Sequence, residues 1–240
     1  MSDPNPVALI TGASRGIGAC SARLFAAAGY DLLLLSRSSA DLEALAVELG
    51  QLGRRVETLV LDLADPAAVA PGLEALCSRG LTPTVVINNA GMAYTGSLAE
   101  MPLEQWQRLM QLNLTAVFQV CQALLPRLRA AGGGHIINVS SHAAHSAFPD
   151  WGAYCVSKAA LGSLSRCLAV EERSSGIRVS TLTLGAVNTP LWESETVHSS
   201  FDRRAMLDVG RAAEALLYLA QQPATLVVED LTLMPAAGVF

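Results

Sequence analysis

The 240-residue sequence has little charge, few cysteines and no long apolar run. Charged residues make up 15% and the formal net charge is -5, which gives no reason to expect nucleic acid or an anionic membrane as a partner. No apolar run approaches the roughly 18 residues that span a bilayer, and the start, MSDPNPVALITG, lacks the basic and apolar regions of a signal peptide. The five cysteines show no C-x-x-C spacing. We therefore expect a cytoplasmic protein without a disulfide framework or a metal site.

Short apolar segments alternate with longer helical patterns along the whole chain. Several of these segments are apolar throughout, which is typical of strands covered on both faces. Strands are expected at 7–11, 31–36, 56–62, 84–88, 135–140, 178–184 and 225–234, and helices at 17–28, 39–52, 66–79, 102–131, 152–174 and 211–221. The alternation predicts an α/β fold, with one domain over 1–240 and a doubly wound parallel β-sheet of about seven strands between helices.

A glycine-rich turn follows the first expected strand. In VALITGASRGIGAC, residues Gly12, Gly16 and Gly18 permit a tight turn and a close approach of a pyrophosphate to a helix N-terminus. The spacing is G-x-x-x-G-x-G rather than G-x-G-x-x-G, and a plain tight turn is the alternative. Ligands of open parallel sheets bind outside the carboxyl ends of the strands, which favours a dinucleotide site here.

The end of the second expected strand bears on which nucleotide would bind. A site that prefers NAD usually carries an acidic residue at this place, to bind the adenine ribose. This sequence has Ser36 and Arg37 instead, with Arg15 in the glycine turn. Two guanidiniums can bind a 2′-phosphate with charge-assisted hydrogen bonds, so the sequence favours NADP(H) over NAD(H). The alternative for Arg37 is a solvated loop arginine.

The stretch AYCVSKAAL (153–161) places a tyrosine four residues before a lysine in an expected helix. Positions i and i+4 are neighbours on a helix, so Tyr154 and Lys158 share one face. A free phenol has a pKa of about 10, and a nearby ammonium favours the phenolate. The pair therefore predicts an acid–base tyrosine, and the alternative is an ordinary amphipathic helix.

Taken together, TGASRGIG (11–18), NNAG (88–91), Asn113, Ser141 and the Tyr154–Lys158 pair resemble the short-chain dehydrogenase/reductase family. The resemblance extends from the first strand to GAVNT (185–189). It implies a single Rossmann-type domain that binds a nicotinamide nucleotide and interconverts a carbonyl and an alcohol. It also implies dimers or tetramers formed through the helical stretch 104–125 and the helix of Tyr154, and a monomer with merely hydrophobic helices is the alternative.

The resemblance assigns a role to individual residues. Tyr154 would be the general acid in reduction and the base in oxidation, and Lys158 would hold the nicotinamide ribose and lower the pKa of the tyrosine. Ser141 would bind the substrate oxygen, with Ser140 as a second candidate, and Asn113 would support a proton-relay water. The residues implied in cofactor binding are Gly12, Ser14, Arg15, Gly16, Ile17, Gly18, Ser36, Arg37, Asp62, Leu63, Asn89, Ala90, Gly91, Tyr154, Lys158, Gly185, Val187 and Thr189. Leu184 replaces the proline that the family has before Gly185.

The substrate is not named by the sequence. His142, Trp151 and Trp192 are candidates for substrate contact, as are Met92 and Tyr94, and residues 185–210 are expected to form the substrate loop. Packing is the alternative for each. The sequence thus predicts an NADP(H)-dependent carbonyl or alcohol oxidoreductase. An NAD(H)-dependent enzyme of the same family and a catalytically idle NADP(H)-binding protein that acts through a partner are the alternatives.

Overall fold

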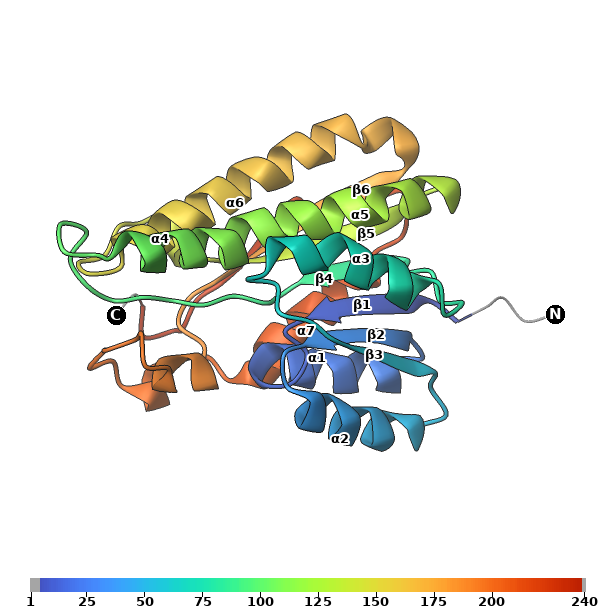
Figure 1. The fold of residues 1–240 in the computed structure, drawn as a ribbon, viewed down its shortest axis with the longest axis horizontal. Helices are drawn as coiled ribbons and strands as arrows, with labels where there is room; N and C mark the ends of the chain where they lie inside the picture. The colour runs from blue at the N-terminus through green and yellow to red at the C-terminus, as the bar shows by residue number, and fades with distance from the viewer. Residues whose placement is uncertain (1–4, 239–240) are drawn as a thin grey trace.

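The computed structural model describes residues 5–238 as one seven-stranded parallel sheet covered by helices on both faces (Figure 1). The strand order is β3-β2-β1-β4-β5-β6-β7. The strands are β1 (Val7–Thr11), β2 (Asp31–Ser36), β3 (Val56–Val60), β4 (Val85–Asn88), β5 (Gly134–Ser141), β6 (Ile177–Leu184) and β7 (Asp230–Leu233). This is the predicted fold class, a Rossmann-like α/β arrangement.

The helices form two layers, one on each face of the sheet (Figure 1). The first layer holds α1 (Gly16–Ala27), α2 (Ser39–Gly50) and α7 (Val209–Ala220). The second holds α3 (Pro66–Cys77), α4 (Leu103–Met110), α5 (Ala116–Ala130) and α6 (Gly152–Glu171). The sequence predicted the ends of these helices to within a few residues, with α4 and α5 as one helix over 102–131.

Successive side chains on the central strands point to opposite faces of the sheet, and this divides the core into two halves. Ala8 and Ile10 of β1 face the layer of α1 and α7, whereas Val7 and Leu9 face the layer of α3 and α5. All four side chains are buried, because helices cover both faces. This explains why β1 and β2 are apolar at nearly every position.

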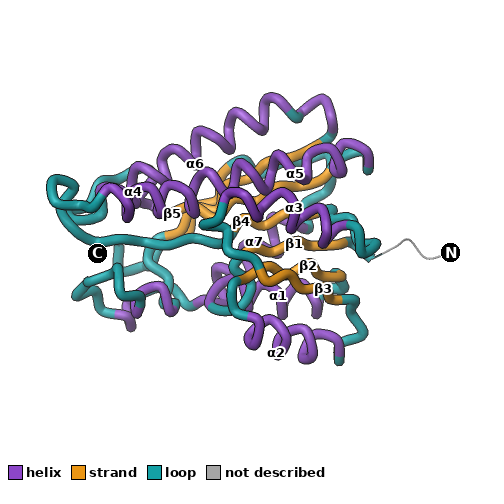
Figure 2. Tube along the Cα trace, viewed as in Figure 1, coloured by secondary structure: helices purple, strands orange, loops and turns teal. Residues whose placement is uncertain are grey.

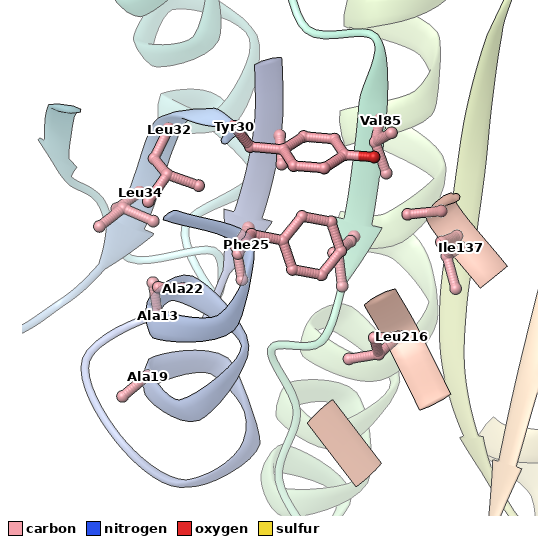
Figure 3. Close-up of a cluster of buried hydrophobic side chains, with 14 of the residues drawn as sticks. Ala13, Ala19, Ala22, Phe25, Tyr30, Leu32, Leu34, Val85, Ile137 and Leu216 are labelled. Carbon is pink, nitrogen blue, oxygen red and sulfur yellow. The ribbon is translucent and has the colours of Figure 1, made fainter. Parts of the chain in front are cut away.

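Helix α1 packs closely on the sheet beneath the glycine-rich turn. The rings of Phe25 and Tyr30 meet edge to face, with their centroids 4.9 Å apart and their planes at 62°. Both rings extend toward β4, with the Tyr30 hydroxyl beside Val85, and the small side chains of Ala19 and Ala22 lie along α1 (Figure 3). This packing fixes the direction in which the first turn of α1 points.

The expected helix 102–131 is one continuous helical stretch with a wider turn in its middle. A π-helical turn over Gln111–Thr115 separates α4 from α5. The stretch Leu103–Ala130 is long and apolar enough to cross a membrane by length and composition. Its apolar side packs against the sheet and α3, as the core helix of a globular fold does.

The last strand is shorter than the predicted 225–234. β7 pairs with β6 only from Asp230 onward. Before that point, the Arg178 guanidinium on β6 donates to the carbonyl oxygens of Gln222, Pro223 and Leu226 at 2.9–3.1 Å. These carbonyls are therefore bound by a side chain rather than by a strand partner, and the apolar residues 226 and 227 stay partly exposed at the sheet edge.

Candidate active site

The loops that connect the elements gather at the carboxyl ends of the strands (Figure 2). A groove lined by residues of these loops and strand ends lies there. The order of connection reverses between β1 and β4, and this is where open α/β sheets bind ligands. The predicted site residues that line the groove are Gly12, Ser14, Arg15, Gly16, Ile17, Ser36, Arg37, Asp62, Leu63, Asn89, Ala90, Gly91, Ser141, Tyr154, Lys158, Gly185, Val187 and Thr189. His142, Trp151, Trp192 and Met92 also line it.

The glycine-rich turn fits a bound pyrophosphate. Gly12 and Gly16 have φ values of 66° and 54°, which favour glycine. A Cβ atom on Gly12 would lie 2.9 Å from the Cα atom of Ala90, so only glycine allows this approach of the two loops. No described side chain caps the first turn of α1 at Arg15. The N–H groups of that turn can therefore donate to an anion in the groove.

Thr11 joins the glycine turn to the loop after β4. Its Oγ1 atom accepts hydrogen bonds from the backbone N–H groups of Asn89 and Ala90, both at 3.0 Å. The Asn89 side chain donates back to the Thr11 carbonyl oxygen at 2.9 Å. Thr11 belongs to the motif TGASRGIG, which predicts no role for it. Its contacts are with a loop nearly 80 residues away, which the motif alone does not reveal.

The two arginines predicted to bind a 2′-phosphate both line the groove. Arg15 and Arg37 are exposed and lie at the ends of the loops after β1 and β2. The Ser36 hydroxyl donates to the Ser14 hydroxyl at 2.7 Å, which holds the two loops together. The nearest predicted acid, Asp62 after β3, accepts a hydrogen bond from the N–H of Ala64 at 2.9 Å. The end of β2 thus presents cations and hydroxyls to the groove.

The Tyr154–Lys158 pair lies in the first turns of α6, facing the end of β5. Lys158 is buried, 6% exposed, and its Nζ atom donates to the carbonyl oxygen of Val139 at 2.9 Å. The same Nζ atom lies 5.7 Å from the centroid of the Tyr154 ring. Ser141 hydrogen-bonds the Tyr154 side chain, whereas the Ser140 hydroxyl is buried without a partner among the described residues. The structure therefore places Ser141, and not Ser140, against the tyrosine.

Burial controls the protonation of both groups. It raises the pKa of Tyr154 to about 12, opposed by the hydrogen bond from Ser141. It also lowers the pKa of Lys158 to about 8. Burial is thus the largest influence on the Tyr154 pKa in the protein by itself, and it acts against the lowering expected from the ammonium. That Lys158 lowers this pKa stays a prediction.

Three predicted residues do not line the groove. Asn113, in the π-helical turn, is 1% exposed and is held by the backbone N–H and carbonyl of Met92, each at 2.9 Å, and by Ser157 at 3.1 Å. Gly18 is buried in α1, where a Cβ atom would lie 2.2 Å from the Gly12 carbonyl oxygen. Gly18 therefore allows α1 to pack closely against the glycine-rich turn. Tyr94 also lies outside the residues that line the groove.

The predicted substrate loop contains two short 3₁₀ helices, Pro190–Glu193 and Arg203–Ala205. The Arg203 guanidinium donates to the Asn188 side chain at 2.7 Å and to the Thr189 carbonyl oxygen at 3.2 Å, and it pairs with Glu193 at 3.2 Å. A second connection joins the loop to residues 93–96, where the Thr95 N–H donates to the Thr196 carbonyl oxygen at 2.9 Å.

Two large side chains that line the groove, Phe148 and Met234, lie outside every segment predicted for the site. Leu191 and Phe201 also line it, and they fall within the predicted substrate loop 185–210 without an individual role. Phe201 stands in a segment without periodicity, and Met234 follows the last strand. Only the fold brings them into the same groove as Tyr154.

A doubly wound sheet with a glycine turn and a buried Tyr–Lys pair in one groove defines a nucleotide-binding oxidoreductase of the Rossmann class. A family described as "short chain dehydrogenase" matches residues 6–199. The chain therefore belongs to the short-chain dehydrogenase/reductase family, and it is an oxidoreductase for which a nicotinamide cofactor is expected.

Several curated relatives resemble this chain. Oxidoreductase UcpA of Escherichia coli K12 is 39% identical over 188 residues, which cover 78% of this chain and 71% of that protein. D-threitol dehydrogenase of Mycolicibacterium smegmatis is 35% identical over 185 residues, covering 77% and 71%. Probable oxidoreductase EphD of Mycobacterium tuberculosis is 35% identical over 191 residues, and the match spans only 32% of that protein's length.

Solved structures show the same fold over nearly the whole chain. An alcohol dehydrogenase from Thermococcus sibiricus complexed with 5-hydroxy-NADP has a TM-score of 0.88 at 32% identity, covering 96% of this chain and 97% of that one. A short-chain dehydrogenase from Sphingobium yanoikuyae in complex with NADPH has a TM-score of 0.84 at 33% identity, covering 96% and 88%.

Proposed function

We propose that this protein is an NADP(H)-dependent oxidoreductase that interconverts a ketone or aldehyde and an alcohol, with Tyr154 as the acid–base group. One observation carries the proposal: Tyr154, Lys158 and Ser141 meet in the same groove as the glycine-rich turn. A pure binding protein needs the turn but has no use for a serine hydroxyl held against a tyrosine beside a buried ammonium.

Each of the three groups has a distinct task in this reaction. A nicotinamide cofactor, when bound, would supply the hydride for the carbonyl carbon or accept it from the alcohol. Tyr154 is neutral at physiological pH, because its pKa is raised to about 12, and so it has a proton to donate to the carbonyl oxygen. The Ser141 hydroxyl orients that oxygen and stabilises its developing charge. Lys158 binds the nicotinamide ribose and supplies positive charge beneath the tyrosine.

The preference for NADP(H) rests on Arg15 and Arg37. Both guanidiniums are exposed at the end of the groove where the adenine ribose of a dinucleotide would lie. The complexes of similar structures with 5-hydroxy-NADP and NADPH support this assignment. The alternative is NAD(H), which would need no cation at these positions.

The cofactor preference is tested by steady-state kinetics with NADPH and NADH. In the double variant Arg15→Ala/Arg37→Ala, the ratio of kcat/KM for NADPH to that for NADH is expected to fall by about 10-fold or more, because charge-assisted hydrogen bonds to the phosphate are lost. Arg166→Ala, an exposed arginine on α6 outside the groove, is the matched control. An unchanged ratio in the double variant would mean that both arginines are solvated and do not bind the 2′-phosphate.

The oxidoreductase activity is tested by mixing the purified protein with NADPH and a panel of carbonyl compounds while nicotinamide absorbance is followed. We expect turnover of at least one ketone or aldehyde. Tight NADPH binding without turnover of any compound would favour the catalytically idle binding protein instead. Cytoplasmic location stays a prediction.

A further inference from the structure

We infer that the substrate is an uncharged, mainly apolar carbonyl compound or alcohol that carries a ring, selected by an aromatic wall formed by Trp151, Trp192 and Phe201. This inference rests on the proposed function, because it names the substrate class of the same site. Three features of the groove carry it: where its charges lie, how the rings are arranged, and how the polar atoms of the wall are used.

The charges of the groove are separated from the site of chemistry. Arg15, Arg37 and Asp62 follow β1, β2 and β3 and line the half of the groove on that side. On the other half, over β5, β6 and β7, Lys158 is the one Lys, Arg, Asp or Glu among the described residues that line the groove. It is buried behind Tyr154 and donates to Val139. A substrate carboxylate or phosphate would therefore find no cation in this half beyond the lysine of the catalytic pair.

Two acids and both arginines of the substrate loop form ion pairs with one another outside the groove. Glu193 is 69% exposed and binds Arg203 at 3.2 Å. Asp202 binds Arg204 at 3.0 Å, and the Arg204 side chain is 91% exposed. None of these four residues lines the groove. The loop therefore places its charges toward solvent and its aromatic residues toward Tyr154.

The aromatic wall begins at the catalytic tyrosine and continues through three rings from separate segments. The Trp151 ring lies 5.6 Å from the Tyr154 ring and 5.5 Å from the Trp192 ring, measured between centroids. Trp192 lies 5.6 Å from Phe201. Trp151 and Phe201 are parallel, with 2° between their planes and 6.4 Å between centroids. Ring pairs at such distances attract, and a substrate ring gains the same contacts.

Two polar side-chain atoms of this half are already hydrogen-bonded within the protein, and the Ser140 hydroxyl is buried. The Trp192 indole N–H donates to the Val187 carbonyl oxygen at 2.8 Å. The His142 Nε2 atom is 3.0 Å from the Ser146 hydroxyl. A polyol or a sugar would lose its hydrogen bonds to water here without gaining equivalents, whereas an apolar ring loses none. Ser141 and Tyr154 remain to bind a single substrate oxygen.

The inference is tested by equilibrium binding, which needs no turnover. Ketones cannot react with the oxidised cofactor, so their dissociation constants are measured by calorimetry on the NADP⁺-loaded protein. The probes are acetophenone, its charged counterpart para-acetylbenzoate, and the polar dihydroxyacetone. We expect acetophenone to bind at least about 10-fold more tightly than either of the other two. Equal or tighter binding of the carboxylate or the polyol would overturn the inference.

Variants then assign the preference to the wall. Trp192→Ala and Phe201→Ala are each expected to weaken acetophenone binding by about 3- to 10-fold and to leave dihydroxyacetone binding unchanged. Tyr94→Ala, in a neighbouring loop outside the groove, is the matched control and should change neither. Unchanged acetophenone binding in both wall variants would contradict the assignment.

The two proposals fail in different ways. If acetophenone binds with the expected preference but is not reduced with NADPH, the substrate inference stands and the proposed reduction is wrong. If carbonyl compounds are reduced while the charged or polar probes bind as well as acetophenone, the proposed function stands and the aromatic wall does not select the substrate.

Discussion

Lys158 is the only lysine in the 240-residue sequence, and it lies buried beside the proposed acid–base residue. Burial lowers its pKa to about 8, so its charge varies within the range in which enzymes are assayed. A lysine pKa that is lower in the folded than in the unfolded chain means that the folded state resists protonation. The buried lysine therefore lowers the free energy of unfolding by its full amount below about pH 8. This loss of stability becomes smaller as the pH rises from about 8 toward the ordinary lysine pKa.

A direct titration of this lysine is possible because no other residue gives the same signal. In protein labelled with ¹³C at the lysine ε-carbon, nuclear magnetic resonance should show one resonance that titrates with a midpoint near 8. In urea-unfolded protein the midpoint should return to about 10.4. A midpoint near the unfolded value in the folded protein would show that the ammonium is well solvated, contrary to the buried site described above.

The residues of the catalytic pair were predictable, but their protonation was not. A tyrosine four positions before a lysine identifies the shared helix face from the sequence alone. The raised pKa of Tyr154 depends on how fully the groove excludes water, and that is set by β5, α6 and the loops together. No pattern in the stretch 153–161 carries this information.

At the scale of elements, the substrate loop is held by side-chain contacts rather than by regular structure. Arg203 connects positions 188, 189 and 193, and Thr95 connects the loop to the segment after β4. Such contacts have no periodicity, which explains why the sequence predicted the strands and helices but assigned no structure to 190–210. The same holds for the π-helical turn at Gln111–Thr115, which the sequence presents as ordinary helix.

Removing Arg203 should loosen the loop without unfolding the protein. Arg203→Ala is expected to raise KM for the carbonyl substrate by about 3- to 10-fold and to speed chymotrypsin cleavage at Trp192 and Phe201. The neighbouring Arg204→Ala is the matched control, because Arg204 binds only Asp202 among the contacts described for its side chain. Identical cleavage rates and KM values in the two variants would mean that Arg203 does not hold the loop.

At the scale of the whole molecule, the helical layer of α4, α5 and α6 presents apolar side chains to solvent. Leu103, Phe118, Val156 and Val170 are 68%, 44%, 43% and 70% exposed. The family resemblance implies that the helical stretch 104–125 and the helix of Tyr154 form the contact between subunits, and exposed apolar residues on these helices favour that arrangement. We therefore propose a homodimer or homotetramer assembled through this layer.

The assembly is tested by sedimentation velocity. The wild-type protein is expected to sediment as a dimer or tetramer, and the double variant Phe118→Glu/Val156→Glu as a monomer, because two carboxylates would be buried at the interface. Val47→Glu, at a residue 67% exposed on α2 in the other helical layer, should leave the assembly unchanged. A monomeric wild-type protein would contradict the proposed assembly. It would not bear on the proposed active site.

The most direct test of the central claim is the rate of a single turnover in the Tyr154→Phe variant, measured by stopped-flow with NADPH and a ketone that the wild type reduces. The variant keeps the ring and loses the hydroxyl that donates the proton, so we expect the hydride-transfer rate to fall by about 100-fold or more. NADPH affinity, measured on the same sample, should change little. A variant that reduces the ketone at close to the wild-type rate would contradict the assignment of Tyr154 as the acid–base residue.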